Sequence, residues 1–510
     1  MLAILAIAAF LGIRFQPLAR EYFVSTLQNR YHSDVELANL QISLYPTVRA
    51  SGDGLVLWFN GRHEGPPLVR IRSFRFEAGF VNFFRTPRHI DHLHLEGLEI
   101  HIPPRSGEPV AQHTNTHAAG SSITVAFVLD EVVADGTSLE IAPRDPSKKP
   151  LVFDISQLTL HTIGIGLPMT FHAALTNPKP PGLVHTDGRF GPWNAEHPAA
   201  TPISGAYTFR DADLSVFKGI TGTLSSDGTF TGQLSRLEVQ GTTDTPDFAL
   251  TVGGHAVPLH TEYQATVDGS NGDTELHPVH ARLGRSDFDV SGSIDRENVI
   301  REKQGARKTI LLEAKTDAGH EDARLEDFLK LSVKGGKTPM TGRIRFTTKV
   351  EIPPGDLDVI DRLQLDGRFG LSAVKFTSPD VQQKIAGLSH RAQGDPTDHD
   401  PDVTAEFSGA FHLRNAQLGL PDLQFSLPGA DVSLHGTYGL RTSALSFQGT
   451  VKLQATVSQM TTGFKRKLLK PIDPLFRRDG SGTILPIGIS GTRGEPSFRL
   501  DLGRIFRRNE

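Results

Sequence analysis

The sequence predicts a mainly β protein: one long curved antiparallel sheet that forms an apolar groove, with an N-terminal membrane-anchor helix and a few short capping helices. Three observations predict this class. From about residue 35 onward, many short runs alternate between apolar and polar residues, as strands with one buried face do. Gly and Pro, at 50 and 33 residues, supply many turns. Strand runs do not alternate regularly with long amphipathic helices, which argues against a parallel α/β fold.

The chain begins with an apolar run, residues 1–13, before the first charge at Arg14. A spanning helix needs about 20 apolar residues. The run is therefore a membrane anchor with a start further upstream, a tilted interfacial helix, a cleaved signal or a buried helix. Arg20 and Arg30 follow the run, which the positive-inside rule disfavours for a cytosolic N-terminus. We expect residues 1–31 to form the anchor and a following helix, with these anchor side chains: Leu2, Ile4, Leu5, Ile7, Phe10 and Leu11.

Alternation is clear in residues 73–77, 92–96 and 157–163, and it is longest in residues 343–352 and 444–457. Successive side chains of a strand point to opposite faces, so each run predicts a sheet with one apolar and one polar surface. The apolar surfaces of the two longest runs are the candidate groove lining: Ile344, Phe346, Val350, Ile352, Leu445, Phe447, Val451, Leu453 and Val457.

Pairs of Asp-Gly or Asn-Gly recur along the chain and are typical of hairpin turns. They predict a meander of antiparallel hairpins with turns at these places: Asp53-Gly54, Asp135-Gly136, Asp227-Gly228, Asp268-Gly269, Asn271-Gly272 and Asp366-Gly367.

Three helices are predicted within the β-rich part. Residues 322–333 have helical apolar spacing, and residues 378–389 begin with a capping Ser378 followed by Pro379. A third helix is expected over residues 458–476.

We divide the chain after the anchor into an N-terminal β-rich region (32–202), a middle β-meander (203–320) and a C-terminal β-rich region with helices (321–510). Loops are expected at residues 106–122, 143–150, 177–202 and 390–402. The tract Asp-Gly-Arg-Phe-Gly occurs at residues 187–191 and again at 366–370, which indicates an internal duplication between the two halves.

Composition excludes several function classes. The chain has no Cys, which rules out thiol catalysis, thiolate metal sites and disulfides. The net charge is −4, so no global positive field exists to hold nucleic acid. Phe, at 30 residues, far outnumbers Tyr at 6 and Trp at 2. This excess indicates that Phe side chains line an apolar surface.

Few polar motifs carry chemistry. His92, His94 and Glu96 could bind zinc or form a solvated strand face, and the tract around Asp395–Asp402 could bind calcium or be a linker. Basic residues around 465–478 and 504–508 could contact lipid headgroups or face solvent. No nucleophile elbow, metalloprotease helix or P-loop occurs. We therefore expect no enzyme activity, no catalytic residue, no cofactor and no metal.

A series of soft, turn-like segments runs through nearly the whole chain in one order. They include residues 217–232, 241–248, 267–274, 339–342, 457–463 and 482–492, and the first strands are joined to the anchor through residues 35–46. In order and extent they resemble the AsmA-like family of bacterial envelope proteins, the relatives of TamB.

That resemblance implies an inner-membrane anchor, a periplasmic body and a long β-groove. It implies transport of lipid, with phospholipid as the expected class, between membranes in support of outer-membrane lipid homeostasis. The alternative is an outer-membrane assembly factor whose sheet edge pairs with strands of client proteins. The expected partners are membrane lipids and the inner membrane, with no nucleic acid and with protein partners unknown.

Overall fold

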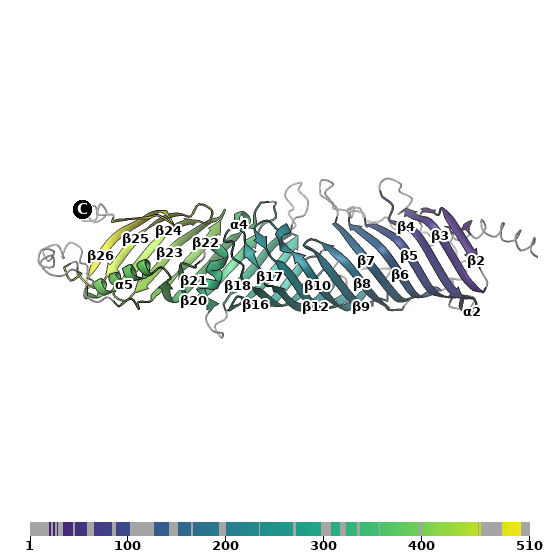
Figure 1. The fold of residues 1–510 in the computed structure, drawn as a ribbon, viewed down its shortest axis with the longest axis horizontal. Coiled ribbons are helices and arrows are strands. Elements are labelled where there is room, and N and C mark those ends of the chain that lie inside the picture. The colour runs from purple at the N-terminus through teal and green to yellow at the C-terminus, as the bar shows by residue number, and fades with distance from the viewer. Residues whose placement is uncertain are drawn as a thin grey trace, which may run out of the picture.

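The computed structural model describes residues 20–21, 24–25, 28, 34–43, 46–58, 66–83, 88–102, 127–141, 151–164, 167–192, 200–233, 235–268, 272–296, 308–316, 323–333, 337–355, 357–396, 400–456, 458–460 and 482–500. They form one 25-stranded sheet and a separate two-stranded sheet. Figure 1 shows the strands lying side by side along the long axis, from β2 at one end to β26 at the other. The mainly β class is therefore confirmed.

The first half of the sheet contains these strands: β1 (Asp34–Glu36), β2 (Asn39–Ser43), β3 (Thr47–Trp58), β4 (Val69–Gly79), β5 (Arg88–Ile102), β6 (Phe127–Ile141), β7 (Leu151–Gly164), β8 (Met169–Pro178), β9 (Pro181–Phe190), β10 (Pro202–Asp213), β12 (Thr223–Gln233) and β13 (Arg236–Thr245). A short helix, α2 (Phe80–Phe83), follows β4, and a 3₁₀ turn, η3 (Leu214–Val216), follows β10. The two-stranded sheet consists of β11 (Ile220–Thr221) and β14 (Ala249–Leu250).

The second half contains these strands: β15 (Leu259–Val267), β16 (Thr274–Leu283), β17 (Ser286–Arg296), β18 (Lys308–Lys315), β19 (Ala323–Arg324), β20 (Met340–Ile352), β21 (Gln364–Phe376), β22 (Ala405–Arg414), β23 (Gln417–Leu427), β24 (Ala430–Gly439), β25 (Ala444–Leu453), β26 (Thr483–Thr492) and β27 (Pro496–Leu500). Its helices are α3 (Leu325–Ser332), α4 (Val359–Arg362) and α5 (Pro379–Gln393). Pairing continues across the boundaries at residues 202 and 320, so the regions divided by sequence share one sheet.

Nearly every strand pairs antiparallel with the next along the chain, but β5 and β6 are parallel. The prediction of a purely antiparallel sheet was wrong at this pair. A parallel pair needs a return connection of a dozen or more residues, and residues 103–126 supply it. The sequence marked a loop there, but loop composition does not reveal the direction in which the next strand runs.

The Asp-Gly pairs were a poor guide to turns. Asp268 and Gly272 do lie at the β15–β16 hairpin, where the Gly272 N–H donates to the Asp268 carbonyl. Four predicted turns are wrong, because their glycines lie inside strands. Gly54 and Gly136 have φ values of 66° and 60° and lie within β3 and β6, with the same register on either side, whereas Gly228 and Gly367 continue regular pairing in β12 and β21.

Two interior glycines, Gly188 and Gly367, make room for aromatic rings on a neighbouring strand. A Cβ atom on Gly188 would lie 2.8 Å from the Phe171 ring, and one on Gly367 would lie 2.8 Å from Phe411 Cζ. Both glycines belong to the repeated Asp-Gly-Arg-Phe-Gly tract, which occupies β9 and β21. In both halves, therefore, the first glycine of the tract lies beneath an aromatic ring from the neighbouring strand.

Two predicted helices are confirmed. Helix α5 begins after Ser378 with Pro379 in its first turn, and it ends at Gly394, whose φ of 87° is the left-handed cap conformation. Helix α3 has Glu326 and Asp327 in its first turn. Most of the third predicted helix (461–476) lies outside the described residues, as do Val457 and these anchor side chains: Leu2, Ile4, Leu5, Ile7, Phe10 and Leu11. Among those described, no helix combines the length and apolar character needed to cross a bilayer.

The sheet curls strongly in its middle. Six strand pairings separate β12 from β20, and at about 4.8 Å each a flat sheet would hold them about 29 Å apart. Yet the Val359 N–H, at the start of α4 after β20, donates to the Lys218 carbonyl just before β12, at 2.9 Å. Only a rolled sheet brings these two connections together. Bulges near Phe209, Glu262 and Leu276 fit this bending, because a bulge bends its strand and increases its twist.

Candidate functional site

One face of the sheet carries a row of apolar side chains and glycines from end to end, and we call it the apolar face. Its continuity follows from register, since directly paired residues point to the same side of a sheet. A single row of paired residues crosses 23 strands, and every member is apolar or glycine apart from the hydroxyl of one tyrosine: Ile42, Ala50, Phe76, Leu93, Val132, Leu160, Phe171, Gly188, Gly205, Phe230, Val239, Ala265, Leu276, Gly292, Leu312, Val350, Leu365, Leu413, Leu418, Tyr438, Leu445, Gly491 and Pro496.

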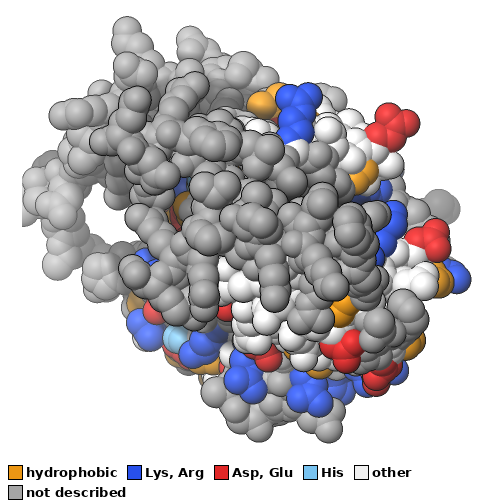
Figure 2. All heavy atoms as spheres, turned by 90° about the vertical axis from the view of Figure 1, so that its left-hand side faces the viewer, with side chains coloured by type: hydrophobic (Ala, Val, Ile, Leu, Met, Phe, Trp, Pro, Cys, Tyr) orange, Lys and Arg blue, Asp and Glu red, His pale blue; other side chains and the backbone are white. Residues whose placement is uncertain are grey.

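The opposite face is polar, and we call it the polar face. The neighbouring row on that face is polar at every position but one: Arg49, Glu77, His92, Glu131, His161, Thr170, Arg189, Ser204, Thr231, Glu238, Thr266, Glu275, Ser293, Leu311, Glu351 and Gln364. The exception, Leu311, is 46% exposed. Figure 2 looks along the molecule from the β26 end and shows acidic and basic side chains over the described part of the surface.

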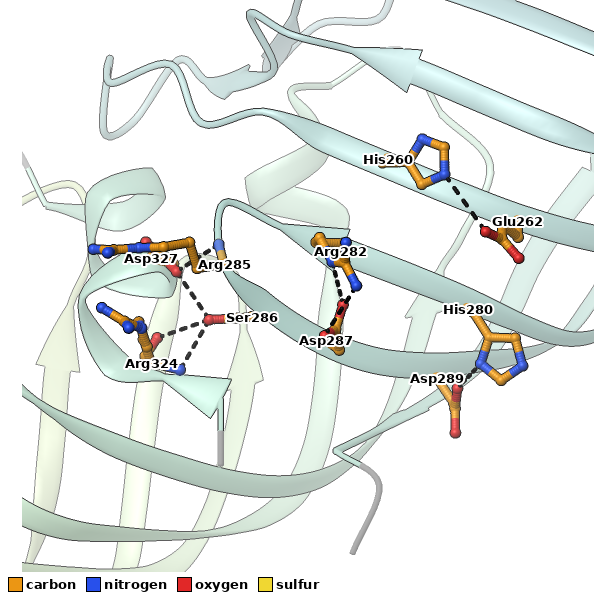
Figure 3. Close-up of polar contacts among 10 residues, drawn as sticks. All are labelled: His260, Glu262, His280, Arg282, Arg285, Ser286, Asp287, Asp289, Arg324 and Asp327. Atoms are coloured by element: carbon orange, nitrogen blue, oxygen red, sulfur yellow. Dashed lines mark hydrogen bonds and ion pairs between the residues drawn. The ribbon is translucent and has the colours of Figure 1, made fainter. Parts of the chain in front are cut away.

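Histidine–carboxylate pairs bind neighbouring strands together on the polar face. His92 Nδ1 lies 2.8 Å from a Glu131 carboxylate oxygen, and His280 Nδ1 lies 2.6 Å from Asp289. Near the second pair is a hollow of about 180 Å³, in which Arg282 and Asp287 also form an ion pair (Figure 3). The Asp287 hydrogen bond raises the pKa of Arg282. The opposite charges of Arg282 and Asp287 therefore neutralise one another across the two strands.

The candidate metal ligands of the sequence lie on this polar face. His94 is 3.5 Å from Glu96 and 3.6 Å from Asp135, while His92 turns to Glu131. Within the described residues, no three His, Asp or Glu side chains are grouped as a metal site would need. In the acidic tract, the His390 ring contacts the Asp400 carbonyl and Asp402 pairs with Lys375, so this segment packs beside α5.

The structure brings the predicted lining residues onto the apolar face. In β20, register places four of them on that face, and in β25 it places four more: Ile344, Phe346, Val350, Ile352, Leu445, Phe447, Val451 and Leu453. Strand β25 ends at Leu453, earlier than the alternation predicted. Their role as a lipid lining stays a prediction.

Sequence reasoning missed the first half of the apolar face as a lining. Large side chains there are half-buried: Phe76, Leu93, Leu95, Leu158, Leu160, Phe171, Phe190, Phe209 and Phe230. The signal was present in the alternation of residues 73–77, 92–96 and 157–163. It was weaker because bulges such as the one between Phe209 and Ala212 shift the period from two to three.

Helices cover the apolar face towards the C-terminal end. Ile385, Leu388 and Ala392 of α5 pack with Leu427 and Leu453 of the sheet. These three helical positions share one side of the helix. Leu325 and Leu329 of α3 pack in the same way on the apolar face of β20–β22, and Ile360 of α4 packs against Leu413 and Leu418.

Helix α3 is fixed by a buried carboxylate, Asp327 (Figure 3). The Ser286 hydroxyl and the Arg285 N–H each donate to Asp327 Oδ2 at 3.0 Å. On the other side of the helix, Phe328 contacts the rings of Phe288 and Phe346 at centroid distances of 5.8 and 5.3 Å. The Asp327 carboxylate thus attaches α3 to the β16–β17 turn. The Phe328 ring of the same helix packs against the apolar face of the sheet.

The described buried clusters are unevenly placed. One lies at β2–β4, where Val24 packs against Leu37 and Leu40. The other three lie between β20 and β26, beneath α3, α4 and α5. Between β6 and β15 the apolar face carries none of these four clusters, and most of its large apolar side chains are half-buried.

Comparison of the chain with protein-family models, with curated proteins and with solved structures finds no match.

Proposed function

We propose that this chain is a membrane-anchored periplasmic protein of the bacterial envelope that binds or conducts lipid along its apolar face, which would form a groove. It would thereby support outer-membrane lipid homeostasis, as the resemblance to AsmA-like proteins implies. The observation that carries the proposal is the register row, which stays apolar across 23 strands.

Physical arguments support lipid as the occupant. Contiguous apolar surface facing water is costly and marks a binding surface. An acyl chain gains about 0.8 kcal/mol for each CH₂ group that it removes from water. Apolar contact is non-directional, so a chain can slide along such a surface without meeting a deep energy minimum. With 22 pairings of about 4.8 Å, the row extends on the order of 100 Å.

Lipid co-purification with substitutions on the open part of the face tests the proposal. The full chain, expressed in a bacterial envelope and purified, should carry lipid that mass spectrometry detects. Phe230→Asp places a carboxylate on the apolar face of β12, where Phe230 lies over Gly205. We expect it to reduce bound lipid at least fivefold. Phe346→Asp and Phe447→Asp test the covered part in the same way.

Thr229→Asp is the matched control, because Thr229 is the exposed neighbour of Phe230 on the polar face. It adds the same charge to the same strand and should leave bound lipid unchanged. Circular dichroism and thermal unfolding confirm that each variant folds. The proposal fails if the wild-type chain never carries lipid, or if Phe230→Asp and Thr229→Asp behave alike in folded protein.

A second candidate function is supported by the end of the sheet. Strand β27 pairs with β26 and with no other strand among the described residues. An unpaired edge can accept a strand from another chain, as an assembly factor for outer-membrane proteins would require. Recovery of unfolded client strands cross-linked to β27, together with absence of lipid, would favour this alternative.

A further inference from the structure

Near its middle the apolar face carries a group of hydroxyl side chains, which we call the hydroxyl patch. It lies in two neighbouring register rows of β10–β15 and contains Tyr207, Ser226, Thr243, Thr261 and Tyr263. Apolar side chains border the row of Ser226, Thr243 and Thr261, with Phe209 on one side and Ala281 followed by Phe288 on the other. In the row of the two tyrosines, Tyr207 pairs with Thr186 of β9. The patch carries hydroxyl groups but no charge.

Glycines let the two tyrosines lie along the face. Gly228 and Gly241 are directly paired between Tyr207 and Tyr263. A Cβ atom on Gly228 would lie 2.7 Å from Tyr207 Cε1, and one on Gly241 would lie 3.1 Å from the Tyr263 hydroxyl. The rings therefore extend towards each other over the two glycines, and their hydroxyls meet in a hydrogen bond.

The direction of the hydrogen bonds follows from counting donors, since a hydroxyl has one hydrogen and two acceptor sites. The Ser226 hydroxyl donates to the Thr242 carbonyl at 2.8 Å, so it can only accept from Tyr207, at 3.1 Å. The hydrogen of Tyr207 is then used, and the Tyr207–Tyr263 bond must be donated by Tyr263. Burial raises the pKa of Tyr207, so its phenol stays protonated and donates throughout the physiological range.

This series of hydrogen bonds ends in an acceptor, the Tyr263 oxygen. The hydrogens of Ser226, Tyr207 and Tyr263 are all directed along the relay, whereas the lone pairs of the Tyr263 oxygen are not used by it. Tyr263 is half-buried, so its side chain retains access from the open side of the face. Thr243 and Thr261 share one hydrogen bond of 2.7 Å, which uses one of their two hydrogens. The patch thus offers an acceptor at Tyr263 beside a spare donor.

We propose that the hydroxyl patch is a binding station for the hydroxyl or amide N–H of a lipid, at the point where that group joins its acyl chains. The inference rests on the proposed lipid function and adds a selectivity to it. A hydroxyl suits the patch because it both donates and accepts. A lipid in which an alkyl group replaces this hydrogen cannot donate to the Tyr263 oxygen. The oxygen then stays without a donor in a partly desolvated site, which is unfavourable.

The test uses two lipids that differ in one hydrogen-bond donor, 1,2-dioleoylglycerol and its 3-O-methyl ether. Each is presented to the purified full chain in phosphatidylcholine vesicles, and the lipid retained by the re-isolated protein is quantified. One hydrogen bond predicts a retention ratio of about three to ten in favour of the alcohol. In Tyr207→Phe/Tyr263→Phe the ratio should fall to about one, because the ether no longer leaves a phenol oxygen unpaired.

Thr229→Val is the control, because it removes a hydroxyl from the polar face of the same strand and should preserve the wild-type ratio. A wild-type ratio of one, with both lipids bound, overturns the station and leaves the lipid-binding proposal standing. A ratio that survives the double tyrosine variant also overturns it. Retention of neither lipid by the wild-type chain contradicts the proposed function itself.

Discussion

The middle and the C-terminal part of the apolar face use the same sequence pattern in different ways. Between β6 and β15, large side chains such as Phe171 and Phe230 lie half-buried over glycines. Between β20 and β26, residues such as Leu427 and Leu453 are buried beneath α5. Alternation in a strand therefore makes an apolar face but does not decide whether the face becomes a core or an open surface.

The difference depends on which connections contain helices. The connections after β18, β20 and β21 contain α3, α4 and α5, which pack back onto the apolar face. The described turns between β7, β8 and β9 are too short to contain a helix. The covered part gains stability from buried contacts, whereas the large apolar side chains of the open part stay half-buried.

The largest expected effect compares a leucine in each part. Leu427→Ala removes a buried side chain under α5 and should cost about 3 kcal/mol, because it leaves a cavity. Leu158→Ala, on the half-buried face of β7, should cost about 1 kcal/mol. Hydrogen exchange of the amides around each site measures local stability. Equal losses would show that the two parts are packed alike.

A second prediction converts covered surface into open surface. Asp327→Ala leaves the Arg285 N–H without its acceptor and the Ser286 hydroxyl with only the Arg324 carbonyl, at 3.3 Å, and should cost about 2 kcal/mol. Helix α3 should then exchange its amide hydrogens faster, and binding of a hydrophobic dye should rise. Lys330→Ala, which removes the neighbouring charge 3.7 Å from Asp327, is the control and should change little. Unchanged exchange in α3 would contradict its anchoring by this carboxylate.

A third prediction uses the repeated Asp-Gly-Arg-Phe-Gly tract. Gly367→Ala should destabilise the chain by about 1–2 kcal/mol, because its new methyl group would meet the Phe411 ring and the Thr347 carbonyl. Gly188→Ala, in the open part, should cost a similar amount, because its methyl group would meet the Ser204 carbonyl of the neighbouring strand as well as the Phe171 ring. Gly370→Ala meets nothing within 4 Å and serves as the control. Urea unfolding of the three variants gives the order.

The smallest effect is expected on the polar face. Arg210 pairs with Asp227 across β10 and β12, and this hydrogen bond raises the pKa of Arg210. Both side chains are exposed, so Arg210→Ala should change stability by less than about 0.5 kcal/mol. High salt should reduce even that difference. A loss of several kcal/mol in urea unfolding would mean that the polar face contributes more than its surface position indicates.

The sequence by itself determined the mainly β class, the separation of apolar and polar faces, and two of the helices. The sequence reveals the two faces because successive side chains of a strand point to opposite sides. It reveals the start of α5 because Pro379 fits the first turn of a helix, although the Ser378 side chain makes no capping hydrogen bond. The lining residues Ile344 and Phe346 could be assigned to one face for the same reason, without knowledge of their neighbours.

Only the tertiary structure decided what depends on pairing between distant strands. It made β5 and β6 parallel, placed Gly228 and Gly367 under aromatic rings and not in turns, and brought Lys218 against Val359. Register also joined Tyr207 to Tyr263 across two intervening strands. Such contacts are set by the packing of one strand on another, and local sequence patterns carry no information on which strand that will be.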